Sequence, residues 1–116
     1  MELTKMESEV IKKIVELEMG LETYDIIDFS SITVEKREFT EVGQYTYLIN
    51  EILLFESDEI SSRVFGESVG IKVPDMENCI DFLLYVSNQG FELLECHTYG
   101  EVYPVKINDY TMVIHR

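Results

Sequence analysis

The sequence is short of basic residues. Nine Lys and Arg stand against 23 Asp and Glu, so the formal net charge is -14 over 116 residues. A field this negative repels nucleic acid phosphates and anionic lipid, and it attracts basic partners. We therefore expect no nucleic acid ligand and no membrane partner. The simplest interpretation of the acidity is solubility, because net charge bears on solubility and association rather than on fold.

Proline, glycine and long apolar runs are also scarce. Two prolines and six glycines are too few for a disordered tail or linker, and 46% hydrophobic residues are typical of a globular chain. The length predicts a single domain over residues 1–116. No stretch approaches the roughly 18 apolar residues of a membrane span, and Met1–Lys5 precedes no apolar leader segment. A cytoplasmic location is the expectation.

Only two cysteines are present, Cys79 and Cys96, and neither lies in a CxxC pair. A chain of this size has no need of a disulfide framework, so we expect reduced, partly buried thiols. A nucleophile at Cys96 served by His97 is disfavoured, because adjacent strand residues point to opposite faces.

The common catalytic and cofactor motifs are missing from the sequence. It has no Gly-rich phosphate loop, no nucleophile elbow, no HExxH and no zinc-holding Cys/His spacing. The prediction is a protein without a metal, a cofactor or catalytic residues. A carboxylate-based enzyme using Asp81, Glu92 and Glu95 is a lesser alternative, because neighbouring carboxylates can act as acid and base or bind a hard cation.

The hydrophobic periodicity of the sequence predicts an amphipathic helix near residues 5–19. Thr4 to Glu7 fit a capping box, and Gly20 supplies a stop. The apolar positions at helical spacing are Met6, Val10, Ile14, Leu17 and Leu21. Such a stripe must cover another element, and we expect that element to be a sheet.

From Ser30 onward, runs rich in β-branched and aromatic residues alternate with turn residues and predict up to six strands. The expected ranges are 30–40, 44–55, 63–73, 79–86, 91–98 and 109–115. Short connections imply antiparallel neighbours. The predicted fold class is α+β, with one N-terminal amphipathic helix packed on a mainly antiparallel twisted sheet of five or six strands.

The clearest hairpin joins 79–86 to 91–98 through Ser87-Asn88-Gln89-Gly90, where glycine allows a positive φ. We expect Val86 to pair with Phe91. Because side chains alternate along a strand, this register decides which residues of the second strand face the core.

Glu95 is the anomaly of that hairpin, because regular pairing from Phe91 places its carboxylate on the buried face. A buried carboxylate must be paired, hydrogen-bonded or neutral, and Arg37 is the candidate partner. The Arg37 and Glu95 pair is expected to be either a structural ion pair or part of a ligand site. A bulge at the Gly90 turn would instead place Cys96 inward.

Four segments of the chain carry a resemblance to other proteins. They are Arg37–Gly43, Gly66–Val73, Phe82–Val86 with Gly90, and Leu94–Gly100 with Pro104. Together they resemble a widespread family of small, uncharacterised bacterial proteins, whose first segment tends to read Arg-Glu-x-Thr-Gly-x-Gly followed by aromatics, and whose last tends to read Leu-Glu-Gly-x-Thr-Tyr with Trp-Pro shortly after. The departures in this chain are Glu41, Gln44-Tyr45, Cys96 and Tyr103. The resemblance covers residues 30–104 and implies a fold unit without an assigned activity.

Acidic residues are densest between Asn50 and Glu101, where eleven Asp and Glu stand against two Lys and Arg. Loops joining the strands could form an acidic rim, and exposed tyrosines could serve as its anchors. The residues expected to contact a partner are Glu51, Glu56, Asp58, Glu59, Asp75, Glu77, Tyr85, Tyr99 and Tyr103.

These features predict a non-catalytic acidic module that binds a basic protein, most specifically an immunity-type inhibitor of a basic toxin or nuclease. The alternative is a small-molecule-binding or regulatory domain that uses the neighbourhood of Arg37 and Glu95. A homodimer formed through an edge strand is also compatible with the sequence.

Overall fold

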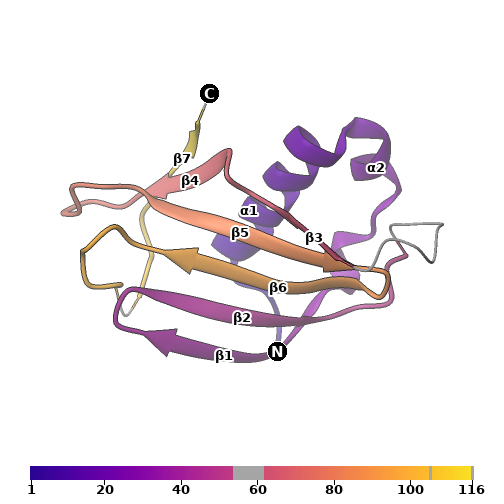
Figure 1. The fold of residues 1–116 in the computed structure, drawn as a ribbon, viewed down its shortest axis with the longest axis horizontal. Coiled ribbons are helices and arrows are strands. Elements are labelled where there is room, and N and C mark those ends of the chain that lie inside the picture. Colours follow the sequence, from indigo (N-terminus) through magenta and orange to yellow (C-terminus); the bar gives the residue numbers. More distant parts are fainter. Residues whose placement is uncertain (54–61, 105, 116) are drawn as a thin grey trace.

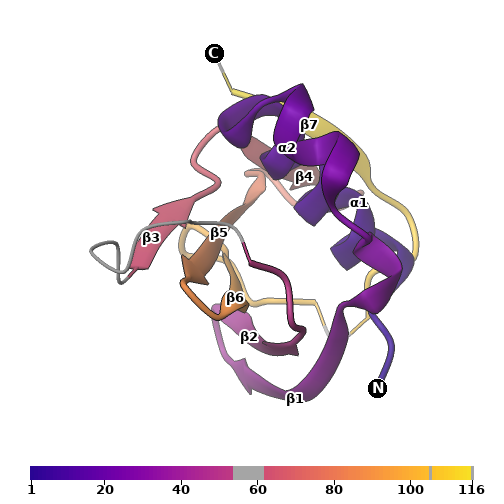
Figure 2. The ribbon, with the colours of Figure 1, turned by 90° about the vertical axis from the view of Figure 1, so that its right-hand side faces the viewer.

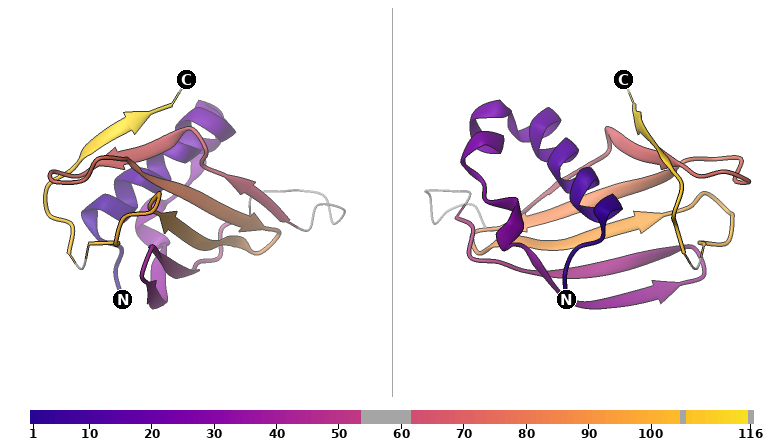
Figure 3. Two further views of the ribbon diagram at one scale, coloured as in Figure 1. Left: turned by 60° about the vertical axis from the view of Figure 1, so that its left-hand side comes forward. Right: turned by 180° about the vertical axis from the view of Figure 1, so that it is seen from behind.

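The computed structural model describes residues 1–53, 62–104 and 106–115. Within them the chain forms helices on one face of a seven-stranded antiparallel sheet (Figure 1). The view from behind in Figure 3 shows the helices lying across that single face. The α+β prediction is confirmed, and the sheet is larger than the five or six strands expected.

The N-terminal helix begins and ends where the sequence indicates. Helix α1 (Lys5–Ile14) has Thr4 as its N-cap, and the reciprocal bonds between Thr4 and Glu7 complete the capping box. A π-helical segment (Val15–Met19) continues it to Gly20, whose φ is 93°. The helix α2 (Leu21–Ile26) was not predicted, because six residues are too short to show helical periodicity.

The strands are β1 (Thr33–Thr40), β2 (Gly43–Ile49), β3 (Ser62–Phe65), β4 (Val69–Lys72), β5 (Ile80–Ser87), β6 (Gly90–His97) and β7 (Thr111–Ile114). Their order is β1-β2-β6-β5-β4-β7, and β3 also pairs with β5. The turn at residues 66–68 divides the expected run 63–73 into β3 and β4, which gives the additional strand. No helix within the described residues is long and apolar enough to cross a membrane.

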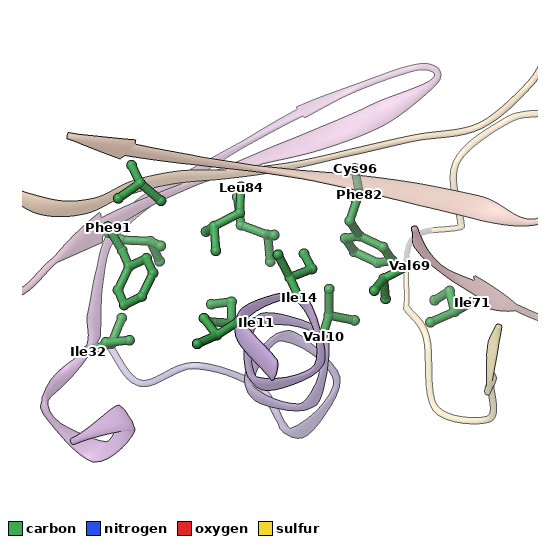
Figure 4. Packing of buried hydrophobic residues seen from close by; sticks show 14 of the residues in the cluster. Val10, Ile11, Ile14, Ile32, Val69, Ile71, Phe82, Leu84, Phe91 and Cys96 are labelled. Atoms are coloured by element: carbon green, nitrogen blue, oxygen red, sulfur yellow. The ribbon is translucent and has the colours of Figure 1, made fainter. Parts of the chain in front are cut away.

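The sheet curves around α1 (Figure 2). Most of the buried core residues come from α1 and from the strands that face it. Val10, Ile11 and Ile14 are fully buried and face Phe82 and Leu84 of β5 (Figure 4). Complete burial of an aliphatic or aromatic side chain contributes about 1.5–3 kcal/mol. The packing of this stripe therefore fixes α1 on the inner face, and no helix of the described residues covers the other face of the sheet.

The hairpin between β5 and β6 contains a bulge that decides the orientation of β6. Val86 pairs with Phe91 as predicted, but the register shifts between Tyr85 and Val86. As a result Cys96 is buried, while Glu95 lies on the outer face of the sheet. Of the two registers that the sequence leaves open, the regular one with Glu95 toward the core is wrong. A bulge just beyond Phe91 places Cys96 inward, as expected for a bulge near the Gly90 turn.

Candidate functional site

The outer face of the sheet, opposite α1, carries the candidate site (Figure 1). Antiparallel register aligns its side chains in rows across β1, β2, β6, β5 and β3. We call this surface the open face. Its residues include Lys36, Glu38, Tyr45, Tyr47, Val64, Asp81, Leu83, Tyr85, Leu93, Glu95 and His97.

Tyrosine and carboxylate side chains are paired repeatedly at this surface. In each pair the phenol hydroxyl donates a hydrogen bond to a carboxylate oxygen. The pairs are Tyr47 with Glu38 (3.3 Å), Tyr85 with Glu95 (3.2 Å) and Tyr99 with Asp81. Tyrosine suits a protein-binding surface because it buries a ring while keeping its polar end in water.

One of these pairs already holds a cation. The Lys36 ammonium lies 3.2 Å from Glu38 Oε1 and 4.7 Å from the centroid of the Tyr47 ring. The hydrogen bond and charge of Glu38 raise the pKa of Lys36. Carboxylate and aromatic face therefore act on the same ammonium group, as expected for combined ion-pair and cation–π contacts.

The Asp81 carboxylate is bonded from two sides. His115 Nε2 lies 2.7 Å from Asp81 Oδ1, and the Tyr99 hydroxyl donates to Oδ2. The hydrogen bond to Asp81, together with some burial, raises the pKa of Tyr99 to about 12. The His97 ring stacks edge-on against Tyr99, with a centroid separation of 5.3 Å. These contacts tie the segment after β6 and the end of the chain to β5.

Glu95 lies at the centre of the open face. It pairs with Tyr45 of β2 on one side and with Leu83 of β5 on the other. The Tyr85 hydroxyl is its hydrogen-bond donor, and within the described residues Glu95 forms no ion pair. A half-buried carboxylate surrounded by tyrosine and leucine side chains is therefore available to a cation from outside the chain.

The third carboxylate of the enzyme alternative lies elsewhere. Glu92 is exposed beside the β5–β6 turn and accepts a hydrogen bond from Ser87. Asp81 and Glu95 share the open face, on adjacent strands. The structure therefore brings two of the three carboxylates to one surface.

Arg37 pairs with Glu7, not with Glu95, so the predicted partner was wrong. Arg37 is opposite Thr46 and points to the inner face, whereas Glu95 points to the outer face. Its Nε donates to Glu7 Oε2 at 3.0 Å and its Nη2 to Oε1 at 2.6 Å. The signal for this pair was in the sequence, because Glu7 precedes Val10 and Ile14 at helical spacing and so falls on the buried stripe.

The buried Glu7 carboxylate, only 2% exposed, joins α1 to the sheet. Thr46 Oγ1 donates to Glu7 Oε2 at 3.0 Å, and Gln44 Nε2 donates to Thr46 Oγ1 at 3.0 Å. The Tyr103 hydroxyl continues this network by donating to Gln44 Oε1 at 3.2 Å. The side chains of Glu7, Thr46, Gln44 and Tyr103 are thereby hydrogen-bonded to one another, which avoids the cost of leaving these buried groups unsatisfied.

Tyr103 cannot present its ring to a partner as predicted, since it is only 7% exposed. Burial and the neighbouring Cys96 raise its pKa. Burial also raises the pKa of Cys96 to about 11, and both cysteines are free thiols, as expected. Tyr103 is therefore part of the inner network rather than of a binding surface.

A cleft of about 370 Å³ lies beside this network. Its lining includes Arg37, Phe39, Tyr103, Pro104 and Lys106. Phe39 is 61% exposed and gives the cleft an apolar wall. The cleft has the mixed apolar and polar lining of a small-molecule site.

Protonation of Glu7 should weaken the fold. Burial alone raises its pKa, but hydrogen bonds from Arg37, Thr4 and Thr46 and the charge of Arg37 outweigh this, and the net pKa is below its usual 4.5. A carboxyl with a lower pKa in the folded state stabilises above its unfolded pKa and loses that contribution as the pH falls through its folded pKa. We expect the melting temperature of the wild type to fall more steeply below pH 4.5 than that of Glu7→Gln. Parallel pH profiles would contradict this role.

The predicted acidic loop residues are not gathered into one rim within the described residues. Glu51 follows β2 and is exposed, while Asp75 and Glu77 are exposed in the β4–β5 turn at the opposite end of the sheet (Figure 1). Glu56, Asp58 and Glu59 lie outside the described residues. Of the predicted tyrosines, Tyr85 lies on the open face and Tyr99 lies beside it, bonded to Asp81.

Comparison of the chain with protein families, curated proteins and solved structures finds no significant match. The resemblance to small bacterial proteins therefore stays a prediction.

Proposed function

We propose that the protein is a non-catalytic binding module that docks a basic protein on its open face. The most specific form of the proposal is an immunity-type inhibitor of a basic toxin or nuclease. The observation that carries it is the Glu95 carboxylate at the centre of the open face. Among the described residues, Glu95 has no ion-pair partner and no helix covers this face. Charge complementarity of this kind determines partner choice and association rate.

The composition of the open face supports protein binding. Tyr45, Tyr47 and Tyr85 are half-buried in the free chain, and Val64 is 52% exposed. Tyrosine is enriched among the residues that dominate interface energetics, and a partly apolar surface gains free energy when a partner removes it from water. The net charge of -14 favours a partner of opposite sign.

A second candidate is a small-molecule-binding or regulatory domain, favoured by the 370 Å³ cleft beside Arg37. The Arg37 guanidinium is already bound to Glu7, so Lys106 is the remaining cationic group among the described residues that line the cleft. Glu95 does not take part, because it lies on the other face of the sheet. This candidate and docking on the open face predict ligand contacts on opposite sides of the sheet.

The test is a capture experiment followed by mapping. The immobilised chain is exposed to total cell protein at low salt and at about 0.5 M salt, where the screening length is a few Å. We expect a basic protein to be retained at low salt and released at high salt. The purified protein is then titrated with wild type, Tyr85→Ala and Ile26→Ala, the last an 80% exposed apolar residue on α2. We expect Tyr85→Ala to weaken binding about 30-fold, as for an interface hot spot, and Ile26→Ala to leave it unchanged.

The outcomes separate the alternatives. Weaker binding by Ile26→Ala but not by Tyr85→Ala would place the partner on the helical side and contradict the proposal. A captured nuclease or toxin whose activity is unaffected by the chain would contradict the inhibitor form alone. Retention of a second copy of the chain would indicate a homodimer. If no protein is retained and a small molecule shifts the amide signals of Lys106 and Phe39, the second candidate is favoured.

A further inference from the structure

The Lys36 site shows how this sheet binds a cation. Lys36 and Tyr47 face each other across β1 and β2, and Glu38 follows two residues after Lys36. The ammonium group is 3.2 Å from the Glu38 carboxylate and 4.7 Å from the ring centroid of Tyr47. The Tyr47 hydroxyl donates to the same carboxylate, at 3.3 Å, so the tyrosine positions the anion and also faces the cation.

The same arrangement recurs between β5 and β6 with one difference. Leu93 and Tyr85 face each other across these strands, and Glu95 follows two residues after Leu93. The Tyr85 hydroxyl donates to Glu95 Oε1 at 3.2 Å. Leu93 therefore occupies the position that Lys36 has in the first site. The second site has the tyrosine and the carboxylate, but an apolar side chain in place of the lysine.

We propose that the pair of Tyr85 and Glu95 is a socket for a lysine or arginine side chain of the basic partner. The inference rests on the proposed function and names its anchoring contact. The Tyr85 hydrogen bond uses one oxygen of Glu95, and the other oxygen can accept from an ammonium or guanidinium group. Leu93 and Tyr45 supply apolar surface for the methylene chain of the basic residue.

The socket can be tested without the partner. The probes are the N-acetyl methylamides of lysine and arginine, with norleucine and citrulline as uncharged counterparts, titrated into the isotope-labelled full chain and followed by amide NMR. We expect saturable shifts around Tyr85 and Glu95 with the charged probes, and binding about tenfold weaker for the uncharged ones. Lysine and arginine curves show which cation the socket prefers.

Three substitutions make the test specific. Glu95→Gln keeps the shape of the side chain and should abolish preference for the charged probes, while Glu38→Gln should leave binding at Tyr85 unchanged. Lys36→Gln should add a second set of shifts, around Tyr47, because it frees the equivalent pair. Unchanged lysine binding in Glu95→Gln, or no charge preference in the wild type, would overturn the socket. Capture of a basic partner that Tyr85→Ala weakens and Glu95→Gln does not would keep the proposed function and reject only the socket.

Discussion

Replacing Arg37 by alanine should lower the free energy of unfolding by about 3–5 kcal/mol, the range for removing one partner of a buried ion pair. The loss is large because Glu7 stays behind at 2% exposure, without the guanidinium that provides two of its hydrogen bonds. Arg37 itself is 18% exposed, so solvent only partly screens the pair. Urea denaturation at neutral pH measures the change.

The neighbouring residue Lys36 is the matched control. It lies on the same strand, but its ion pair with Glu38 is on the opposite face, with more than half of each side chain exposed. Lys36→Ala should therefore leave the unfolding free energy nearly unchanged. The double variant Glu7→Gln with Arg37→Met should be much less destabilised than Arg37→Ala, because it leaves no charge buried. Equal losses for Arg37→Ala and Lys36→Ala would show that the buried pair does not support the fold.

Hydrophobic periodicity and the capping residues predicted α1, the helix that supplies most of the helical residues of the core. Thr4, Glu7 and Gly20 mark the ends of the N-terminal helix through local hydrogen bonds and backbone freedom, so neighbouring residues suffice to identify them. The α+β class followed from the change of period after Ser30. Tertiary partners could not be predicted in this way, because they are distant in the sequence. Arg37 and Glu7, for example, are 30 residues apart.

The candidate site could be predicted only in part, because one bulge changes the face of the sheet to which the β6 side chains point. Glu95 was singled out as a carboxylate beside apolar residues, which is correct, but the bulge beyond Phe91 turns it from the core to the open face. A slip of one residue inverts every side chain of a strand, and no local pattern in β6 distinguishes the two registers. The same register sends Cys96 into the core and leaves Tyr85 beside Glu95.

Gly43→Ala should be the second strongly destabilising substitution, with a loss of about 3 kcal/mol, the upper end of the usual range for overpacking. Gly43 is the last residue of the segment Arg37–Gly43 and the first residue of β2, a strand next to the centre of the sheet. A Cβ atom there would lie 2.1 Å from the Cys96 carbonyl oxygen, a backbone atom that cannot rotate away. The β2–β6 ladder would have to separate, and Thr46 and Gln44 of the Glu7 network would move with it.

Gly100→Ala distinguishes space from backbone freedom as the reason for the glycine at position 43. Gly100 has a φ of +83°. Apart from its two chain neighbours, no atom of the described residues lies within 4 Å of the position that an alanine Cβ would take, so alanine there meets backbone strain but no clash. Left-handed strain costs roughly 1–2 kcal/mol, so Gly43→Ala should be the more destabilising of the two by urea denaturation. A larger loss for Gly100→Ala than for Gly43→Ala would mean that β2 and β6 separate at Cys96 at little cost. In the expected order, glycine is required at position 43 because two strands approach closely over the buried network that holds α1 to the sheet.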